Sequence, residues 1–432
     1  MAQTRQPTTV DVAIIGGGLV GASLACALGD LIEAEQARAN EQARADERAR
    51  ADERESGGEP RAPLRVAIIE PQPLPSVDEV GAYQPSFDAR ASAIAHGSRR
   101  HFEQLKVWPT MREQASPIRH IHVSERGHLG ATRLHADELG VEALGYVIPN
   151  AWMGRALHAR LDRLPIDWHC PARVETLEPA HGGYRLTLDT GEIIQAGLTV
   201  LADGGRSGFK ERLGIESDHH PYQQTALIAN VEMSRAHDGW AFERFTQEGP
   251  MALLPLTGRR MELVWTHEQG DIEEALALPD SLFLDRLQRA FGDRAGRFRR
   301  VGQRHAYPLS LITARETIRP HLAILGNAAH SLHPVAGQGF NLALRGVMDL
   351  AAAIETARAN GRTAGDARTL AAFEASRTAD THQIVRFSDG LIRLFGIDHA
   401  MLGHTRAAGL VGLNALGPLR RTLARRAMGI ER

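Results

Sequence analysis

Residues 10–28 read VDVAIIGGGLVGASLACAL, an apolar run that passes directly into closely spaced glycines and then into small residues. Gly16, Gly18 and Gly21 give the spacing GxGxxG between a predicted strand and a predicted helix. The first glycine permits a tight turn, the second lets a pyrophosphate approach the backbone, and the third allows close packing of helix on strand. These residues predict a Rossmann-like unit that binds a dinucleotide.

Glu70 supplies the acidic residue that such a unit needs after its second strand. It ends the apolar run VAII at residues 66–69, and a carboxylate there can accept hydrogen bonds from a ribose hydroxyl. The usual gap from the last glycine is about 20 residues. Here the gap is 49 (70 minus 21), which indicates an insertion.

The insertion contains three charged hexads. Residues 37–54 read ARANEQ, ARADER and ARADER, and SGGEP follows at residues 56–60. Alanine and paired charges favour a solvated helix or a disordered excursion, and a six-residue repeat places no fixed apolar stripe on a helix. Two interpretations stay open, a surface expansion without chemistry and an arm that docks a partner.

Composition sets the outer limits. A chain of 432 residues that is 43% hydrophobic can bury a large core, and we expect two intimately joined domains. The charges are nearly balanced, 50 basic against 52 acidic, which gives no indication of nucleic-acid binding. Cys26 and Cys170 lie far apart, which argues against a disulfide framework or a zinc site and agrees with a reducing cytoplasm. We expect both cysteines to be small core residues.

The middle of the chain has a different pattern. Strand-like runs separated by turn residues occupy residues 225–233, 241–245, 251–256 and 261–266. They predict a mainly antiparallel sheet that is inserted between the parallel-strand segments. Such a sheet could form a wall of a substrate pocket.

A second glycine-rich segment lies late in the chain. The apolar run LAIL at residues 322–325 is followed by GNAAHSLHPVAGQGFN at residues 326–341 and then by a helix-like pattern. A helix start offers unpaired N–H groups and the positive end of the helix dipole, so it can hold an electron-rich or anionic group. This segment predicts a ligand contact.

Asp203 and Gly204 follow a third buried-strand run, LTVLA at residues 198–202. The GxGxxG turn, this DG turn and the GNAAHSLHPVAGQGFN segment, in that order, resemble the single-component flavoprotein aromatic hydroxylases of the para-hydroxybenzoate hydroxylase type. The resemblance covers nearly the whole chain apart from the insertion. No second GxGxxG occurs, which argues against a flavoprotein with two Rossmann domains.

Within that class, residues 87–95 (FDARASAIA) and residues 418–429 (PLRRTLARRAMG) are similar to segments of the ubiquinone-biosynthesis hydroxylases. Relatives more often carry an aspartate after the glycine of the late motif. Asn327 in that place resembles the 2-octaprenyl-6-methoxyphenol hydroxylase branch, which we therefore predict.

The resemblance implies a set of FAD contacts. The adenosine end is expected on the GxGxxG glycines and Glu70, and the flavin end on the late motif. A surface ion pair remains the alternative for each arginine of the set, and Lys210 stands where an arginine is common. The expected cofactor-binding residues are Gly16, Gly18, Gly21, Glu70, Arg90, Arg155, Asp203, Gly204, Gly326, Asn327, Gly337, Gln338, Gly339, Asn341 and Leu342.

Two histidines in the late motif receive different interpretations. His330 is predicted to organise the turn. His333 precedes Pro334, which would face the flavin, so these two residues are the catalytic candidates, with a structural role as the alternative for His333. No metal site is expected, because the spacing of the histidines brings no carboxylate partner and the chemistry needs no metal.

The implied reaction is the hydroxylation of an electron-rich phenol ring with FAD, NAD(P)H as co-substrate and O2, and the phenol-activating base is not identified. The resemblance implies a polyprenylated substrate in ubiquinone biosynthesis. Two alternatives stay open, a related hydroxylase acting at another ring position or on another phenol, and a flavin-binding scaffold of a quinone-synthesis complex with low turnover.

No stretch reaches the ~18 apolar residues that span a bilayer, so we expect a cytoplasmic protein. Apolar residues at 391–397 and 410–416 precede four arginines between 420 and 426, which could contact the inner-membrane surface or other ubiquinone-biosynthesis proteins, with core packing as the alternative.

The predicted fold is α/β, a three-layer Rossmann-like FAD-binding domain with an interleaved, mainly antiparallel substrate domain and a C-terminal helical segment. The predicted boundaries are 1–80 for the first FAD-binding unit with the charged insert 31–62, 81–215 for its continuation with the first substrate-domain segments, 216–318 for the antiparallel sheet, 319–385 for the closing FAD-binding segment and 386–432 for the helical region.

Overall fold

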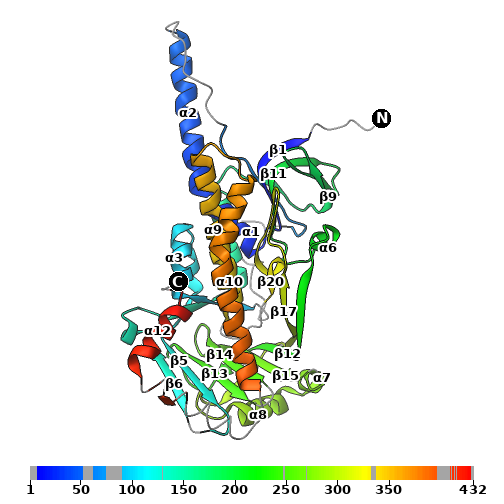
Figure 1. The fold of residues 1–432 in the computed structure, drawn as a ribbon. Coiled ribbons are helices and arrows are strands. Elements are labelled where there is room, and N and C mark those ends of the chain that lie inside the picture. The colour runs from blue at the N-terminus through cyan, green and yellow to red at the C-terminus, as the bar shows by residue number, and fades with distance from the viewer. Residues whose placement is uncertain are drawn as a thin grey trace.

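A computed structural model shows a parallel sheet at one end of the molecule and an antiparallel sheet at the other, joined by long strands and helices (Figure 1). The structure describes residues 7–51, 62–73, 90–128, 130–246, 249–268, 270–331, 337–396, 409, 411–412, 414 and 416–429.

The first sheet contains the parallel strands that the sequence predicts. Its central order is β19-β11-β1-β2-β8, all parallel, and β18 pairs antiparallel with β19 at the edge. Strands in such a sheet are covered on both faces and read as continuous apolar runs, as VAII does in β2. The bounds are β1 Thr8–Ile15, β2 Val66–Ile69, β8 Asp167–His169, β11 Ile193–Leu201, β18 Ile318–Arg319 and β19 Leu322–Ile324.

Three layers result, as predicted. One face of the parallel sheet packs on helices through a core that joins Ile14 to Leu24 and Leu344. The opposite face packs on a β-meander through Ile15 and Leu186. The covering elements are α1 Leu19–Ala27, α5 Asn150–Leu161 and α9 Gln338–Ala359 on one face, and β9 Val174–Ala180, β10 Gly183–Leu188 and the short helix α6 Phe209–Arg212 on the other side of the sheet.

The second sheet confirms the antiparallel prediction for residues 225–266 and extends it. Its order is β20-β17-β12-β15-β14-β13-β5-β6, with β16 also paired to β12. Helices α7 and α8 cover one face, α7 through Ile272 and α8 through Phe283 and Phe291. The bounds are β5 His120–Glu125, β6 Ala131–His135, β12 Ser217–Met233, β13 Trp240–Thr246, β14 Gly249–Pro255, β15 Arg260–Glu268, β16 Phe298–Val301, β17 His305–Ala314, β20 His330–Ser331, α7 Ile272–Ala277 and α8 Asp280–Phe291.

Strands β5 and β6 come from an earlier part of the chain, and β5 pairs parallel with β13. The two sheets therefore interleave along the sequence, while the domain boundaries stay a prediction. A small third sheet and short helices fill the space between them. They are β3 Ala91–Ala95, β4 Ser116–Ile118, β7 Gly145–Pro149, α3 His96–Gln104, α4 Trp108–Met111, η1 Arg112–Gln114 and η2 Asp137–Leu139.

The charged insertion is helical where the structure describes it. Helix α2 (Gly29–Ala51) projects from the parallel-sheet end (Figure 1), and its base is held by Arg358, whose guanidinium donates to Glu35. Helices α10 (Ala367–Gly396) and α12 (Gly417–Ala427) form the C-terminal part. Cys26 is buried as predicted, whereas Cys170 is only half-buried, so the core prediction for Cys170 is wrong. None of the helices in the described residues is long and apolar enough to cross a membrane.

Candidate functional site

The GxGxxG turn joins β1 to α1, and its three glycines meet different surroundings. Gly16 has φ +107°, in the region that favours glycine, and lies against Ala202. A Cβ on Gly21 would overlap the carbonyl oxygen of Gly16. At Gly18, which precedes the first turn of α1, an added Cβ would meet no atom within 4 Å among the residues that the structure describes. Close packing therefore requires glycine at positions 16 and 21, whereas Gly18 leaves room beside the helix N-terminus.

Glu70 lies at the end of β2 and reaches the same turn. Its Oε2 accepts a hydrogen bond from the backbone N–H of Gly17 at 2.7 Å, and its Oε1 accepts one from Gln72 N–H at 2.9 Å. Glu70 therefore reaches the glycine turn although the insertion lengthens the sequence between them. Each carboxylate oxygen has a further lone pair for a ligand hydroxyl.

Two residues that the sequence interpretation missed support the turn from the other side. His158 on α5 brings a ring nitrogen 3.2 Å from the carbonyl oxygen of Gly17. The ring of Trp168 in β8 packs edge-on against His158, with centroids 5.8 Å apart. No motif marks either residue, because their role depends on α5 and β8 lying beside β1 and β2.

The DG turn lies beside the first glycine. Asp203 directs its carboxylate into its own loop, where it accepts from the N–H groups of Gly205 (3.1 Å) and Ser207 (2.5 Å). Lys210, which stands where an arginine is common, is buried. Its Nζ donates to the carbonyl oxygen of Ala328 at 3.4 Å. This contact ties the DG turn to the late motif.

The late motif returns to the GxGxxG turn. Gly326 has φ +64°, and an added Cβ would lie 2.9 Å from Val20 of α1. Asn327 beside it is exposed. Farther along, an added Cβ on Gly339 would meet no atom of the described residues within 4 Å. The candidates His333 and Pro334 lie outside the described residues.

Asn341 fixes the start of α9. Its Nδ2 donates to the carbonyl oxygens of Ala93 (2.8 Å) and Gly337 (2.7 Å), and its Oδ1 accepts from Ala95 N–H (2.9 Å). The side chain is 1% exposed, and Gln338 and Leu342 are also buried. These bonds occupy both amide hydrogens, which indicates that Asn341 positions the helix start.

The two arginine candidates rest on aromatic rings. The guanidinium of Arg90 lies 4.7 Å from the ring centre of Tyr307, and that of Arg155 lies 5.4 Å from the ring centre of Trp152. The backbone carbonyl of Arg90 also accepts from Asn150 N–H, at the first residue of α5. Both arginines therefore lie near α5. Neither forms an ion pair, the alternative interpretation, with another of the described residues.

Glu262 in β15 is a buried carboxyl beneath this region. It accepts a hydrogen bond from Ala91 N–H at 2.8 Å. Burial raises its pKa to about 7, although the hydrogen bond from Ala91 and the charge of Arg90 act in the opposite direction. Glu262 thus links the antiparallel sheet to β3.

We predict that Glu262→Gln changes how stability depends on pH. The carboxyl ionises near 4.5 when unfolded and at about 7 when folded, so the folded protein binds more protons between these values and stability falls as pH rises through them. The amide cannot ionise and keeps an oxygen acceptor for Ala91. We expect the variant to exceed the parent in stability by roughly 2 kcal/mol at about pH 8, with no such gain at about pH 5, in denaturant titrations. A constant difference across this range would contradict the prediction.

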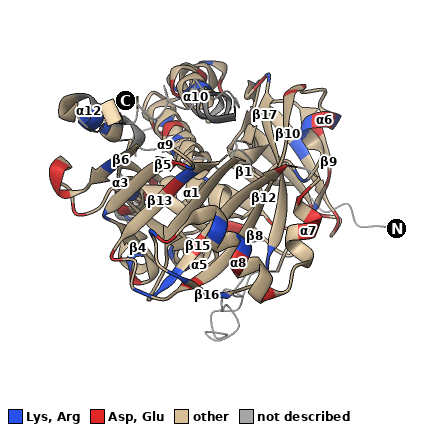
Figure 2. Ribbon diagram, turned by 90° about the horizontal axis from the view of Figure 1, so that it is seen from below, with Lys and Arg blue, Asp and Glu red and all other residues tan. Residues whose placement is uncertain are grey.

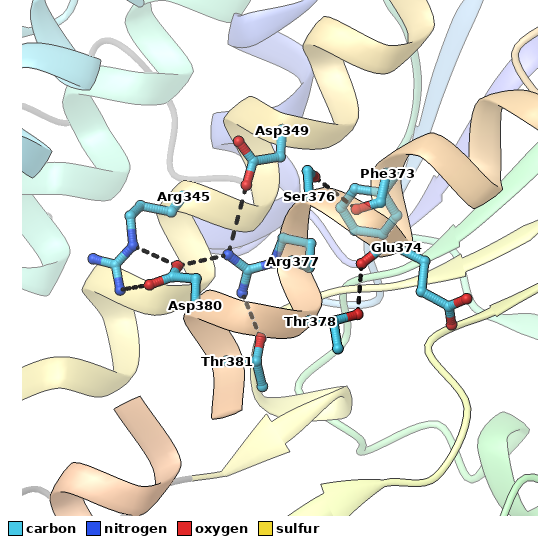
Figure 3. A network of polar contacts seen from close by, with 9 residues as sticks. All are labelled: Arg345, Asp349, Phe373, Glu374, Ser376, Arg377, Thr378, Asp380 and Thr381. Carbon is cyan, nitrogen blue, oxygen red and sulfur yellow. Dashed lines mark hydrogen bonds and ion pairs between the residues drawn. The ribbon is translucent and has the colours of Figure 1, made fainter. Parts of the chain in front are cut away.

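Helices α9 and α10 are braced by a buried ionic network behind the late motif (Figure 3). The guanidinium of Arg345 donates to both oxygens of Asp380, at 2.8 and 3.3 Å. Arg377 donates to Asp380 at 3.2 Å and lies 3.8 Å from Asp349. Such a network holds a defined arrangement of two helices because breaking one member leaves a buried charge.

His330 lies next to this network, in a short β-bridge with β17, and lines a cavity of about 270 Å³ between α9 and α10. Burial, with the charge of Arg377, lowers its pKa to about 4. The imidazole is therefore neutral near pH 7, in keeping with the predicted structural role. The described residues contain no group of three or more His, Cys, Asp or Glu side chains that could hold a metal ion.

Contacts link the GxGxxG turn, Glu70, the DG turn and the start of the late motif into one strip. Glu70 contacts Gly17, Gly16 lies against Asp203, the DG turn meets η3 (Gly326–Ala328), and Gly326 lies against α1. The strip exposes two helix N-termini, at Gly18 and at Gly339, where no side chain from the described part of the chain occupies the space. An extended ligand with a phosphate in its middle fits this arrangement, since a helix start is suited to an anion.

Comparison with known proteins identifies the ligand class. A family model described as FAD binding domain matches residues 79–388. The chain is 35% identical to the ubiquinone hydroxylase UbiL of Rhodospirillum rubrum, over 97% of this chain and 89% of the relative. It is 28% identical to the 3-demethoxyubiquinol 3-hydroxylase of Escherichia coli, over 99% of this chain and the full length of the relative.

A solved structure gives the same fold. PqsL of Pseudomonas aeruginosa, described as a probable FAD-dependent monooxygenase, superimposes with a TM-score of 0.69 at 21% identity, covering 94% of this chain and 100% of that structure. The two chains therefore share the same fold.

Proposed function

We propose that this chain, which belongs to the FAD binding domain family and is an FAD-dependent monooxygenase, hydroxylates the ring of a polyprenylated phenol in ubiquinone biosynthesis, with NAD(P)H as co-substrate. The observation that supports the proposal is the strip from Glu70 to Gly339, which offers two helix N-termini to an extended ligand such as FAD. Within the late motif, His330 and Ser331 also pair with β17 of the antiparallel sheet.

The residues of the strip would divide the work of binding. Glu70 would accept hydrogen bonds from the ribose, the N–H groups after Gly18 would face the pyrophosphate, and Asn327 would contact the ribityl part. No atom of the described residues would crowd a Cβ at Gly339, so the backbone there would be able to approach a flat ring. Bound FAD supplies the redox chemistry with O2, and the protein positions the phenol and excludes water.

The ring position is a further proposal. Asn327 in the late motif favours the branch that hydroxylates 2-octaprenyl-6-methoxyphenol. The E. coli relative is named for a different step, 3-demethoxyubiquinol 3-hydroxylation, so another ring position or another phenol is the first alternative. A flavin-binding scaffold of a quinone-synthesis complex with low turnover is the second.

The deciding experiment is an anaerobic reduction of the FAD-loaded protein by NADH or NADPH, with and without a prenylated 6-methoxyphenol, followed by an oxygen pulse and mass analysis of the phenol. A product heavier by one oxygen atom supports the hydroxylase and its substrate class. Reoxidation that yields only hydrogen peroxide would argue for another substrate or for the scaffold.

A polyprenylated substrate resides in a membrane, and the C-terminal region offers a contact surface. Val411 and Leu416 are 52% and 57% exposed, and Figure 2 shows basic residues on α12. The same region is partly core, since Ala424 and Met428 are buried and the carbonyl oxygen of Met428 accepts from Gly97 N–H. We propose a peripheral membrane contact through the exposed side chains only.

We predict that Arg421→Gln/Arg425→Gln weakens binding to vesicles that contain anionic lipid, because each basic residue near such a surface contributes about 1 kcal/mol. Two losses correspond to roughly a 30-fold change in partitioning, measured by vesicle sedimentation. Both side chains are exposed, so FAD content should not change. Equal sedimentation of variant and parent would remove this surface from the proposal.

A further inference from the structure

A cavity of about 450 Å³ lies at the outer edge of the antiparallel sheet, far from the FAD strip. His122 of β5, Arg133 of β6 and Phe242 of β13 line it, together with Trp240, Arg235 and Arg294. Figure 1 shows β5, β6 and β13 at the end of the molecule opposite to β1. The volume lies within the range of small-molecule sites.

The cavity opens on the face that carries α8. Phe242 packs edge-on against Phe291 of α8, with ring centres 5.9 Å apart. His122 pairs with Phe242 on one side and with Arg133 on the other, so their side chains share that face. In β15, Met261 and Leu263 point toward α8 and belong to its core. Glu262 lies between them, so its side chain points to the opposite face, where it contacts β3 near the FAD strip. The sheet therefore separates the cavity from the FAD strip.

Positive charge dominates the cavity. Arg133, Arg235 and Arg294 are exposed at its rim. Arg244 lies nearby, and burial together with the charges of Arg126 and Arg294 lowers its pKa. The acidic side chain among the lining residues is Asp238, and Asp293 beside Arg294 is engaged with Arg297 at 3.6 Å. The mutual repulsion of these guanidinium groups would be relieved by an anion.

His122 provides a second, independent sign of a ligand. It is 2% exposed, and no donor or acceptor within the described part of the chain lies within hydrogen-bonding distance of its Nε2. Burial, with the charges of Arg294 and Arg133, lowers its pKa to about 4. A buried polar atom without a partner is costly, and a ligand in the cavity can supply the partner.

The aromatic wall restricts the ligand further. The rings of Trp240 and Phe242 are stacked with centres 6.1 Å apart, and His120 lies 4.8 Å from Trp240. Guanidinium groups form paired hydrogen bonds with the oxygens of phosphate. We propose that this cavity binds the phosphate group of an organic phosphate ester, whose remaining part rests on Trp240 and Phe242.

The test uses the full-length, FAD-loaded protein and calorimetric titration with glycerol 3-phosphate. The variant Arg133→Gln/Arg294→Gln should bind at least ~10-fold more weakly, because it loses two charge-assisted contacts. The control Arg259→Gln/Arg300→Gln removes the same charge from exposed positions paired with Glu232 and should bind like the parent. His122→Phe should also weaken binding, since it keeps a ring but removes the nitrogen.

A second arm distinguishes the source of the phosphate. Phosphatidylcholine vesicles with and without phosphatidate are sedimented with the parent and both double variants. Phosphatidate-dependent sedimentation that is lost in Arg133→Gln/Arg294→Gln but kept in the control supports a lipid headgroup, whereas titration heat without sedimentation supports a soluble ester. Absence of both signals in the parent, or equal signals in both double variants, would overturn the proposal.

Discussion

Gly21→Ala is expected to destabilise the protein by about 3 kcal/mol and to weaken FAD binding on the order of 100-fold. The new Cβ would overlap the carbonyl oxygen of Gly16 and lie 3.0 Å from Ile14. Both neighbours belong to the first strand or its turn, so relief requires the start of α1 to move away from β1. That movement displaces the N–H groups that would face the pyrophosphate. Denaturant titration of the apoprotein and FAD fluorescence titration measure the two effects.

Gly18→Ala is the matched control, because it adds the same methyl group to the same turn. Gly18 has φ −68°, which alanine tolerates, and the methyl group would meet no atom within 4 Å in the part of the chain that the structure describes. We expect the stability of the apoprotein to change by less than ~0.5 kcal/mol while FAD affinity falls. If Gly21→Ala bound FAD like the parent, or Gly18→Ala unfolded the apoprotein, the assignment of these two glycines would be wrong.

Asn341→Ala is expected to cost about 3 kcal/mol of stability and to lower FAD occupancy. The substitution leaves the N–H of Ala95 and the carbonyl oxygens of Ala93 and Gly337 without their partner, and each buried polar group without a partner costs ~1–3 kcal/mol. The start of α9 would lose its attachment to β3, and with it the position of Gly339. Thermal unfolding with and without FAD measures the loss.

Asn360→Ala provides the comparison at the other end of α9. The amide of Asn360 also donates to a backbone carbonyl, that of Thr356 at 2.7 Å, but its side chain is exposed. Water can replace that bond, so we expect a change below ~0.5 kcal/mol. A similar loss in both variants would mean that Asn341 contributes only a local cap.

The sequence predicted the elements whose signal is local. The GxGxxG spacing is such a signal, because a turn of that shape needs glycine at fixed positions. In the structure, Gly16 and Gly21 are confined by neighbouring atoms. The apolar runs within residues 225–266 predicted strands that pair antiparallel. Charge and alanine content predicted that the insertion departs from the core, and α2 does so as a helix.

Other features could not be read from local pattern. Strand β5 pairs with β13, more than a hundred residues away, and no periodicity in β5 records that partner. His158 supports Gly17 from α5, and Glu262 supports Ala91 from another sheet. Asn341 was predicted to contact the flavin. Its side-chain amide forms three hydrogen bonds within the protein, which gives it a role in positioning the start of α9.

By itself the sequence determined that the chain contains a Rossmann-like dinucleotide-binding unit. Glycine spacing and apolar runs depend on backbone sterics and burial, which act over a few residues. It also determined the order of the motifs that mark an FAD-dependent hydroxylase. Only the tertiary structure decided which side chains meet, including Glu70 with Gly17 across the insertion and the arginines that surround His122. Those contacts join segments distant in the chain, and their geometry is fixed by how the sheets and helices pack.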